Sequence, residues 1–133
     1  KKFIQKIMWQ LKQGKDELFI VDDKLGTPTY THDFANNVRL LLEKKYWGLY
    51  NMVCGGITGR YEVAVELIDI LGLKGSIKVT PVASDYWKEE YFADRPPSER
   101  LIDKKLNLRG VNIMRDWKIC LKEYINDYYQ NYL

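Results

Sequence analysis

The sequence predicts an α/β fold with a small mixed sheet and about five helices. Three observations support this fold class. Several segments repeat apolar residues at helical spacing, short apolar or alternating runs lie between them, and glycine-rich turns join the two kinds of segment. Because strands alternate with helices, we expect a sheet covered by helices. With 133 residues, of which 46% are hydrophobic, the chain has material for one domain, or part of one.

The first part of the chain predicts a helix, a strand and a second helix. Residues 2–13 carry apolar side chains at helical spacing, and Gly14 follows as the residue that ends the helix. The run ELFIVDD, residues 17–23, is typical of a buried strand. Thr31 is predicted to cap the second helix. The two apolar faces are Phe3, Ile4, Ile7, Met8 and Leu11, and then Phe34, Ala35, Val38, Leu41 and Leu42.

The middle of the chain predicts a strand, a turn and a helix. The run LYNMVC, residues 49–54, is interpreted as a second strand, and GGITG, residues 55–59, as a turn. Thr58 is placed to cap the following helix, which ends before Gly72. The predicted inward face of that helix holds Tyr61, Ala64, Val65, Ile68 and Leu71.

The last part predicts a third strand and a terminal helix. SIKVTPV, residues 76–82, alternates as a strand does, and residues 100–103 suit a short extended piece. Residues 115–132 form the predicted terminal helix, with Trp117, Cys120, Leu121, Tyr124 and Tyr128 directed inward.

Charge and apolar patterning exclude several classes of partner. The net charge is +3, and the 21 basic and 18 acidic residues are interleaved along the chain, so nucleic acid is not the expected partner. No apolar run approaches the roughly 18 residues of a membrane span. The opening segment has a helical apolar period in place of a signal peptide's apolar core. We therefore expect a cytoplasmic protein without a membrane partner.

Residue types that commonly carry catalysis or bind metals are scarce. His32 is the only histidine, and its place in the first turn of a predicted helix favours a solvated residue over a general base. Cys54 and Cys120 lie far apart in the sequence, which favours two reduced packing residues over a metal or redox pair. We expect no metal site and no histidine-dependent nucleophile.

Two segments invite a phosphate-binding interpretation. Gly55, Gly56 and Gly59 do not have the G-x-G-x-x-G spacing, so a tight turn is favoured over a phosphate-binding loop. The alternative is a turn that lines the site of a phosphate-bearing ligand, with Thr58 facing that site. Arg95 precedes two prolines, which hold the backbone extended. Its guanidinium could then clamp a phosphate with two hydrogen bonds, and a solvated loop arginine is the alternative.

Taken in order, these segments resemble the C-terminal half of the dTDP-4-dehydrorhamnose reductases, a branch of the extended short-chain dehydrogenase/reductase family. The resemblance covers nearly the whole chain. It is carried by G-x-P-T-Y-x-x-D-x-A at residues 26–35, by residues 48–72, and by the R-P…S…D-x-K-L pattern at residues 95–106. Ile102 stands between Leu101 and Asp103 where the family usually has Leu-Asp, and Asp116 stands where relatives often carry proline.

The resemblance implies a C-terminal part of an extended Rossmann-type reductase. Residues 1–133 would be its substrate-binding portion, elements within residues 1–54 would complete a Rossmann sheet, and the N-terminal NAD(P)-binding portion would be absent. The family's chemistry uses a glycine fingerprint for NAD(P)H and a Tyr-x-x-x-Lys pair. None of the ten tyrosines here has lysine four residues on. We therefore expect no catalytic and no cofactor-binding residue in this chain, and NAD(P)H only in the full-length protein.

The implied function is binding of a dTDP-sugar in an enzyme that reduces dTDP-4-dehydro-L-rhamnose to dTDP-L-rhamnose. Arg95 would neutralise the diphosphate, with Thr58 and Ser98 in supporting positions. The missing N-terminal Rossmann portion would be a partner, and a homo-oligomer is compatible with the apolar helix faces. Three alternatives stay open: a non-catalytic regulatory module such as the regulatory subunit of methionine adenosyltransferase, another sugar-nucleotide epimerase or dehydratase, and an unrelated domain that binds acidic partners through lysines.

Overall fold

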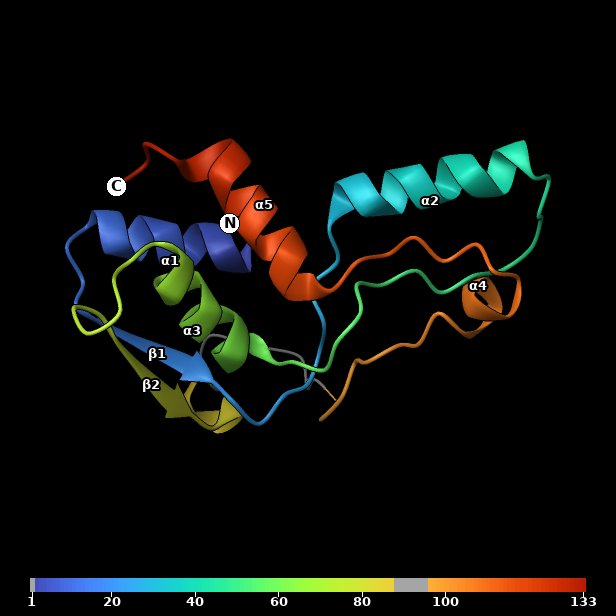
Figure 1. The fold of residues 1–133 in the computed structure, drawn as a ribbon. Helices are drawn as coiled ribbons and strands as arrows, with labels where there is room; N and C mark the ends of the chain where they lie inside the picture. Colours follow the sequence, from blue (N-terminus) through green and yellow to red (C-terminus); the bar gives the residue numbers. More distant parts are fainter. Residues whose placement is uncertain (1, 88–95) are drawn as a thin grey trace.

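A pair of parallel strands lies at the base of the larger part of the fold (Figure 1). The computed structural model describes residues 2–87 and 96–133. Strand β1 (Glu17–Val21) pairs with β2 (Lys78–Val82), with Glu17 opposite Lys78 and Val21 opposite Val82. A short 3₁₀ helix, η1 (Ser84–Trp87), follows β2. The connection between two parallel strands must cross back over the sheet, and it contains two of the helices.

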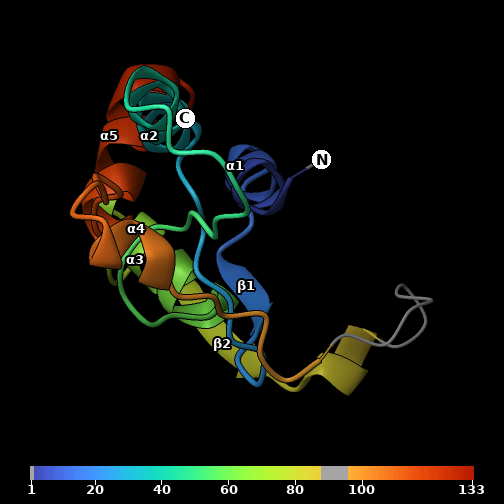
Figure 2. The same ribbon diagram turned by 90° about the vertical axis from the view of Figure 1, so that its right-hand side faces the viewer.

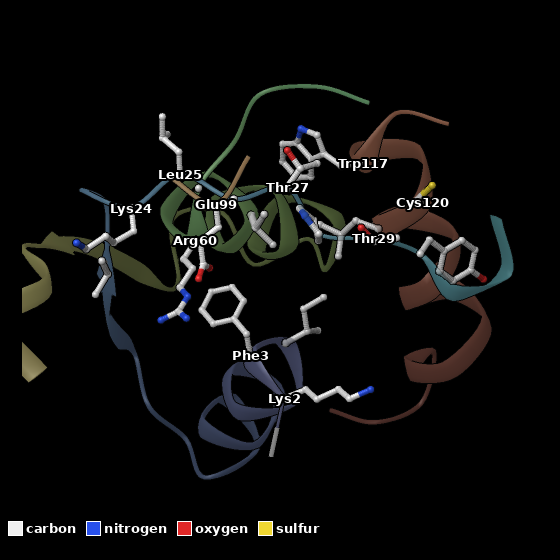
Figure 3. A pocket seen from close by; sticks show the side chains of 18 of the residues that line it. Lys2, Phe3, Lys24, Leu25, Thr27, Thr29, Arg60, Glu99, Trp117 and Cys120 are labelled. Atoms are coloured by element: carbon white, nitrogen blue, oxygen red, sulfur yellow. The ribbon is translucent and has the colours of Figure 1, made fainter. Parts of the chain in front are cut away.

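Three helices form the main core with this sheet. They are α1 (Phe3–Lys12), α3 (Arg60–Ile70) and α5 (Trp117–Tyr129). Helix α3 contacts both strands and α5. The buried side chains include Ile7, Met8, Leu18, Leu67, Cys54 and Leu121. Their burial brings the start of α3 and the start of α1 to the same side of the fold (Figure 3).

The smaller part of the fold lies apart from the sheet. It consists of α2 (Thr31–Glu43), the short α4 (Lys104–Leu108) and the chain segments on either side of them (Figures 1 and 2). Leu41, Leu106 and Val111 form its small core. The fully buried Asn37 joins α2 to the neighbouring segment, since its amide donates to the Val111 carbonyl at 3.1 Å and its carbonyl accepts from Ile113 N–H at 3.0 Å.

The predicted α/β class and the five helices are confirmed within the described residues. Gly14 and Gly72 follow α1 and α3 with φ of 77° and 69°, the left-handed conformation in which glycine ends a helix. Thr31 and Thr58 are not caps. Helix α2 begins one residue earlier than predicted, so the residue before it is Tyr30. Helix α3 begins one residue later than predicted, so the residue before it is Gly59.

The predicted strand at residues 49–54 is wrong, because this segment finds no partner strand in the described part of the chain. The Val53 N–H instead donates to the Asp103 carboxylate at 3.0 Å, and the Gly55 N–H donates to the Arg115 carbonyl at 3.0 Å. Residues 100–103 also belong to no helix or strand. The described sheet is therefore two-stranded and parallel, whereas three or four strands in a mixed arrangement were expected.

Of the predicted inward face of α2, only Leu41 is buried. The buried residues of this helix are Asp33, Asn37 and Leu41, whereas Phe34 and Leu42 are 42% and 54% exposed. The physical reason is that α2 packs on polar backbone and on Arg115, so hydrogen-bonding side chains face inward. Of the other predicted core residues, Val65 and Tyr128 are exposed, at 43% and 55%, and Ala35 is exposed as well.

Candidate functional site

A cavity of about 660 Å³ lies between the start of α1, residues 24–31 and the start of α3 (Figure 3). Its volume falls within the range of small-molecule sites in proteins. The wall combines apolar side chains with a few polar and charged ones. Phe3, Val21, Val63, Trp117 and Leu121 are among the apolar residues, and Lys2, Lys24, Thr27, Thr29, Arg60 and Glu99 are among the polar ones.

Leu25 joins the segments that border this cavity through main-chain hydrogen bonds. Its N–H donates to the Pro97 carbonyl at 2.9 Å, and its carbonyl accepts from Glu99 N–H at 2.9 Å. The next N–H, of Gly26, donates to the Thr58 carbonyl at 3.0 Å. Three stretches that lie far apart in the sequence therefore meet at one residue.

Glycine is required where these segments cross. A Cβ at residue 59 would lie 2.7 Å from the Lys24 carbonyl oxygen, which is main chain and cannot move aside. Any larger residue at Gly59 would push the start of α3 away from residues 24–26. The predicted tight turn at GGITG is thus explained by the close approach of another chain segment.

The turn at residues 26–29 is tied to the same region. The Thr27 hydroxyl donates to the Gly56 carbonyl at 3.0 Å, and the Tyr30 N–H donates to the Cys54 sulfur at 3.3 Å. These bonds hold the chain between β1 and α2 against residues 54–59. The abrupt change from strand to helix therefore forms part of the cavity wall.

The wall near α5 offers protonated groups at neutral pH. Burial, with the charges of Glu123 and Asp127, raises the pKa of Tyr30 to about 12. Burial, with a hydrogen bond to Tyr129, raises the pKa of Tyr124 to about 12. Burial, and then a hydrogen bond to Asp33, raises the pKa of the Cys120 thiol. This wall provides neutral hydrogen-bonding groups and apolar surface, which suit binding more than nucleophilic chemistry.

Two predicted site residues border the cavity without lining it. Thr58 is 2% exposed, and its hydroxyl donates to the Gly59 carbonyl at 3.2 Å. Ser98 is exposed, and its hydroxyl oxygen accepts from Arg100 N–H at 3.3 Å. Both residues flank Leu25. Arg95 lies outside the described residues, so the role assigned to it stays a prediction, as do those of Thr58 and Ser98.

Arg60 and Phe3 line the cavity but were not identified from the sequence as site residues. Phe3 has the helical spacing of a core residue. Arg60 is the first residue of α3, where an arginine is commonly solvated. The signal that could have identified Arg60 is its place directly after a glycine-rich turn, since such turns are often next to ligands.

His32 and the two cysteines have structural partners. The two ring nitrogens of His32 lie 3.3 Å from the Tyr30 hydroxyl and 2.9 Å from the Tyr128 hydroxyl. Cys54 and Cys120 are both buried, as expected of packing residues, and their sulfur atoms lie 3.7 Å apart. Within residues 2–87 and 96–133, no three His, Cys, Asp or Glu side chains are arranged to hold a metal ion.

Comparison with known proteins gives a consistent result. The family described as the RmlD substrate binding domain matches residues 1–130. The spore coat polysaccharide biosynthesis protein SpsK of Bacillus subtilis (strain 168) is 30% identical over 120 residues, which are 90% of this chain and 40% of that protein. The dTDP-4-dehydrorhamnose reductase of Escherichia coli (strain K12) is 26% identical over 131 residues, covering 92% of this chain and 43% of the enzyme.

Solved structures of dTDP-4-dehydrorhamnose reductases are similar to this fold. The Clostridium acetobutylicum structure is 38% identical with a TM-score of 0.79, covering 91% of this chain and 42% of that one. The Bacillus anthracis structure, which is in complex with NADP, is 25% identical with a TM-score of 0.81, covering 96% and 43%. The chain thus spans less than half the length of the relatives it matches. Across its described residues, no helix has the length and hydrophobicity needed to cross a membrane.

Proposed function

This chain belongs to the RmlD substrate binding domain family, and on that premise we propose that it is the sugar-nucleotide-binding portion of a dTDP-4-dehydrorhamnose reductase-like enzyme. The cavity between α1 and α3 is the observation that carries the proposal. It is large enough for a nucleotide sugar, and each of the three sequence segments that carry the resemblance lines part of it, as Thr27, Arg60 and Glu99 do.

The full-length protein is proposed to reduce the 4-keto group of dTDP-4-dehydro-L-rhamnose to the alcohol of dTDP-L-rhamnose. In that reaction NAD(P)H supplies the hydride and a tyrosine supplies the proton. Both the glycine fingerprint and the Tyr-x-x-x-Lys pair would come from an N-terminal portion that this sequence does not include. Residues 1–133 would contribute the substrate site.

We also propose that elements within residues 1–54 complete the sheet of that N-terminal portion. One feature supports it. In the described chain β1 has a partner strand, β2, on one edge only, so its other edge has main-chain groups that a further strand can use.

Arg95 and Ser98 are proposed to face the nucleotide sugar in the intact enzyme, and Thr58 is proposed to support the site. The attachment of residues 97–99 to Leu25 supports this assignment, because it brings the segment that follows Arg95 to the rim of the cavity. Arg95 would bind the diphosphate, since a guanidinium can donate two parallel hydrogen bonds to phosphate oxygens. Thr58 would act mainly through its carbonyl, which positions Gly26.

Titration calorimetry of the purified chain with dTDP-L-rhamnose tests the proposed function. We expect saturable binding that dTDP competes with and that ADP-ribose does not. Arg95→Ala should weaken binding about 10- to 150-fold, and Arg95→Lys should restore part of it, because an ammonium keeps the charge but loses the second hydrogen bond. Absence of binding by the chain, together with absence of reductase activity in the full-length protein, would contradict the proposal.

A further inference from the structure

We propose that Arg60 binds the diphosphate of the nucleotide sugar, with the Phe3 ring holding its guanidinium in position. The inference rests on the proposed function and adds a residue that the sequence motifs did not identify. Three observations support it: a fixed backbone at Arg60, a guanidinium without a carboxylate partner in the described chain, and a cavity wall that combines cationic and apolar side chains.

The backbone at Arg60 is fixed from both sides. The N–H of the preceding Gly59 donates to the Glu62 carboxylate at 2.8 Å, and Gly59 also pairs with Leu25. Helix α3 then continues for 11 residues into the main core. Since neither neighbour can shift without breaking these contacts, the Cα–Cβ direction of Arg60 is set by the fold.

The side chain of Arg60 points into the cavity next to Phe3 (Figure 3). The guanidinium carbon lies 5.9 Å from the centre of the Phe3 ring, a cation–π distance. No carboxylate of residues 2–87 or 96–133 lies within ion-pair distance of it. A guanidinium that lies against an aromatic ring and makes no ion pair in the described chain can donate hydrogen bonds to a bound anion.

Other arginines in the fold are used differently. Arg115 donates to both Asp33 and Glu123, so its N–H groups are occupied. Arg109 stacks over Tyr46 and contacts the Tyr50 hydroxyl. Arg39 pairs with Glu43 on the outer surface of α2. Among these, Arg60 is the arginine that lines the cavity.

The mixed lining of the cavity suits an anionic ligand that also carries apolar groups. Arg60 lies at one side, whereas Trp117 and Cys120 lie at the other (Figure 3). Lys2 and Lys24 also line the wall and add positive charge, and the acidic residues among the described part of the lining are Asp85 and Glu99. A diphosphate next to Arg60 would leave the rest of the nucleotide sugar along the apolar and threonine-rich wall.

The test compares ligands that differ in the diphosphate, using calorimetry on the whole chain. The ligands are dTDP-L-rhamnose, dTDP, inorganic pyrophosphate, thymidine and NADPH. We expect Arg60→Ala to weaken binding of dTDP-L-rhamnose and dTDP about 10- to 100-fold and to leave thymidine binding unchanged. Arg60→Lys should recover part of the loss. Arg39→Ala, which removes an exposed arginine far from the cavity lining, is the matched control.

Phe3 is tested as a positioning residue. Phe3→Leu keeps an apolar side chain but removes the ring, so pyrophosphate binding should weaken about 2- to 5-fold. Phe3→Tyr retains the ring and should restore binding. Failure of Phe3→Tyr to restore binding would show that Phe3 acts through packing of α1 alone, which would overturn its part in the inference.

The outcomes separate this inference from the proposed function. If the wild-type chain binds dTDP-L-rhamnose and Arg60→Ala binds it equally well, the assignment of Arg60 is wrong and the proposed function stands. If the wild type binds pyrophosphate in an Arg60-dependent way but not dTDP-L-rhamnose, Arg60 binds phosphate and the proposed substrate is wrong. If Arg60→Ala weakens NADPH binding alone, the diphosphate belongs to the cofactor and the inference is overturned.

Discussion

Asp33 and Arg115 form an ion pair, with a buried carboxylate and a partly exposed guanidinium, that joins the start of α2 to the segment before α5. The Arg115 Nη2 atom lies 2.6 Å from Asp33 Oδ1, and the Arg115 main-chain N–H donates to Asp33 Oδ2 at 3.1 Å. Asp33 is 5% exposed, whereas the Arg115 side chain is 39% exposed and also donates to Glu123. The carboxylate therefore depends on Arg115 for most of the hydrogen bonds that replace water.

Replacing Asp33 by asparagine should lower the free energy of unfolding by about 2 kcal/mol, because charge-assisted hydrogen bonds to a buried group are lost while the side-chain volume is kept. Urea unfolding followed by circular dichroism measures the change. Arg39→Ala, which removes an exposed i,i+4 pair, should change the same quantity by less than about 0.5 kcal/mol. Equal effects of the two substitutions would contradict the importance assigned to Asp33.

The same ion pair predicts a pH dependence of stability. Hydrogen bonds from Arg115 hold the pKa of Asp33 and that of Glu123 below their usual values. A carboxyl group with a lowered folded-state pKa stabilises the fold above its unfolded-state pKa of about 4 and loses that contribution as the pH falls further. We expect the urea midpoint to fall between pH 5 and pH 3, and to fall less in Asp33→Asn. A parallel decrease in both proteins would contradict the assignment to Asp33.

The outer face of α2 predicts concentration-dependent self-association. Phe34 and Leu42 lie two helical turns apart on this face and are 42% and 54% exposed. Sedimentation velocity at several concentrations should show dimers or larger species, and the double variant Phe34→Ser, Leu42→Ser should shift the chain to monomer. In contrast, Ile7 and Leu11 of α1 are buried within the chain, so that helix needs no partner for its apolar face. A wild type that stays monomeric at all concentrations would refute this prediction.

The isolated chain is expected neither to bind NADPH tightly nor to reduce a 4-keto sugar nucleotide. The reason is that the sequence has no G-x-G-x-x-G fingerprint and no Tyr-x-x-x-Lys pair. Titration of NADPH fluorescence against the purified chain is the measurement, with the full-length protein as the positive control. Saturable micromolar binding by the chain would contradict the expectation.

Local patterns predicted the helices because their apolar spacing and the glycines that follow them are encoded in neighbouring residues. Gly14 and Gly72 are examples. The orientation of α2 could not be predicted in this way. Asp33 and Asn37 face inward because their partners Arg115 and Val111 lie 82 and 74 residues away in the sequence. An apolar-face rule assigns such polar residues to solvent.

The strand predicted at residues 49–54 failed for a related reason. An apolar run identifies a buried extended segment, but only the rest of the fold decides whether another strand is within reach. Here the Val53 N–H is bonded to Asp103 and the Gly55 N–H to Arg115. For the candidate site, the ligand-binding roles of Arg95, Thr58 and Ser98 stay predictions, and Arg60 could not be identified without knowing which helix start faces Phe3.

The meeting of three segments at Leu25 and Gly26 predicts that the rim of the cavity opens through two separate contacts. The amide protons of Leu25, Gly26 and Glu99 are each hydrogen-bonded to a main-chain carbonyl on another stretch of the chain. Releasing residues 97–99 frees two of these protons at once, and releasing Thr58 frees the third. In native-state hydrogen exchange the Leu25 and Glu99 amides should therefore share one opening free energy, and a bound nucleotide sugar should slow both by the same factor, whereas the Gly26 amide reports on the separate contact with Thr58.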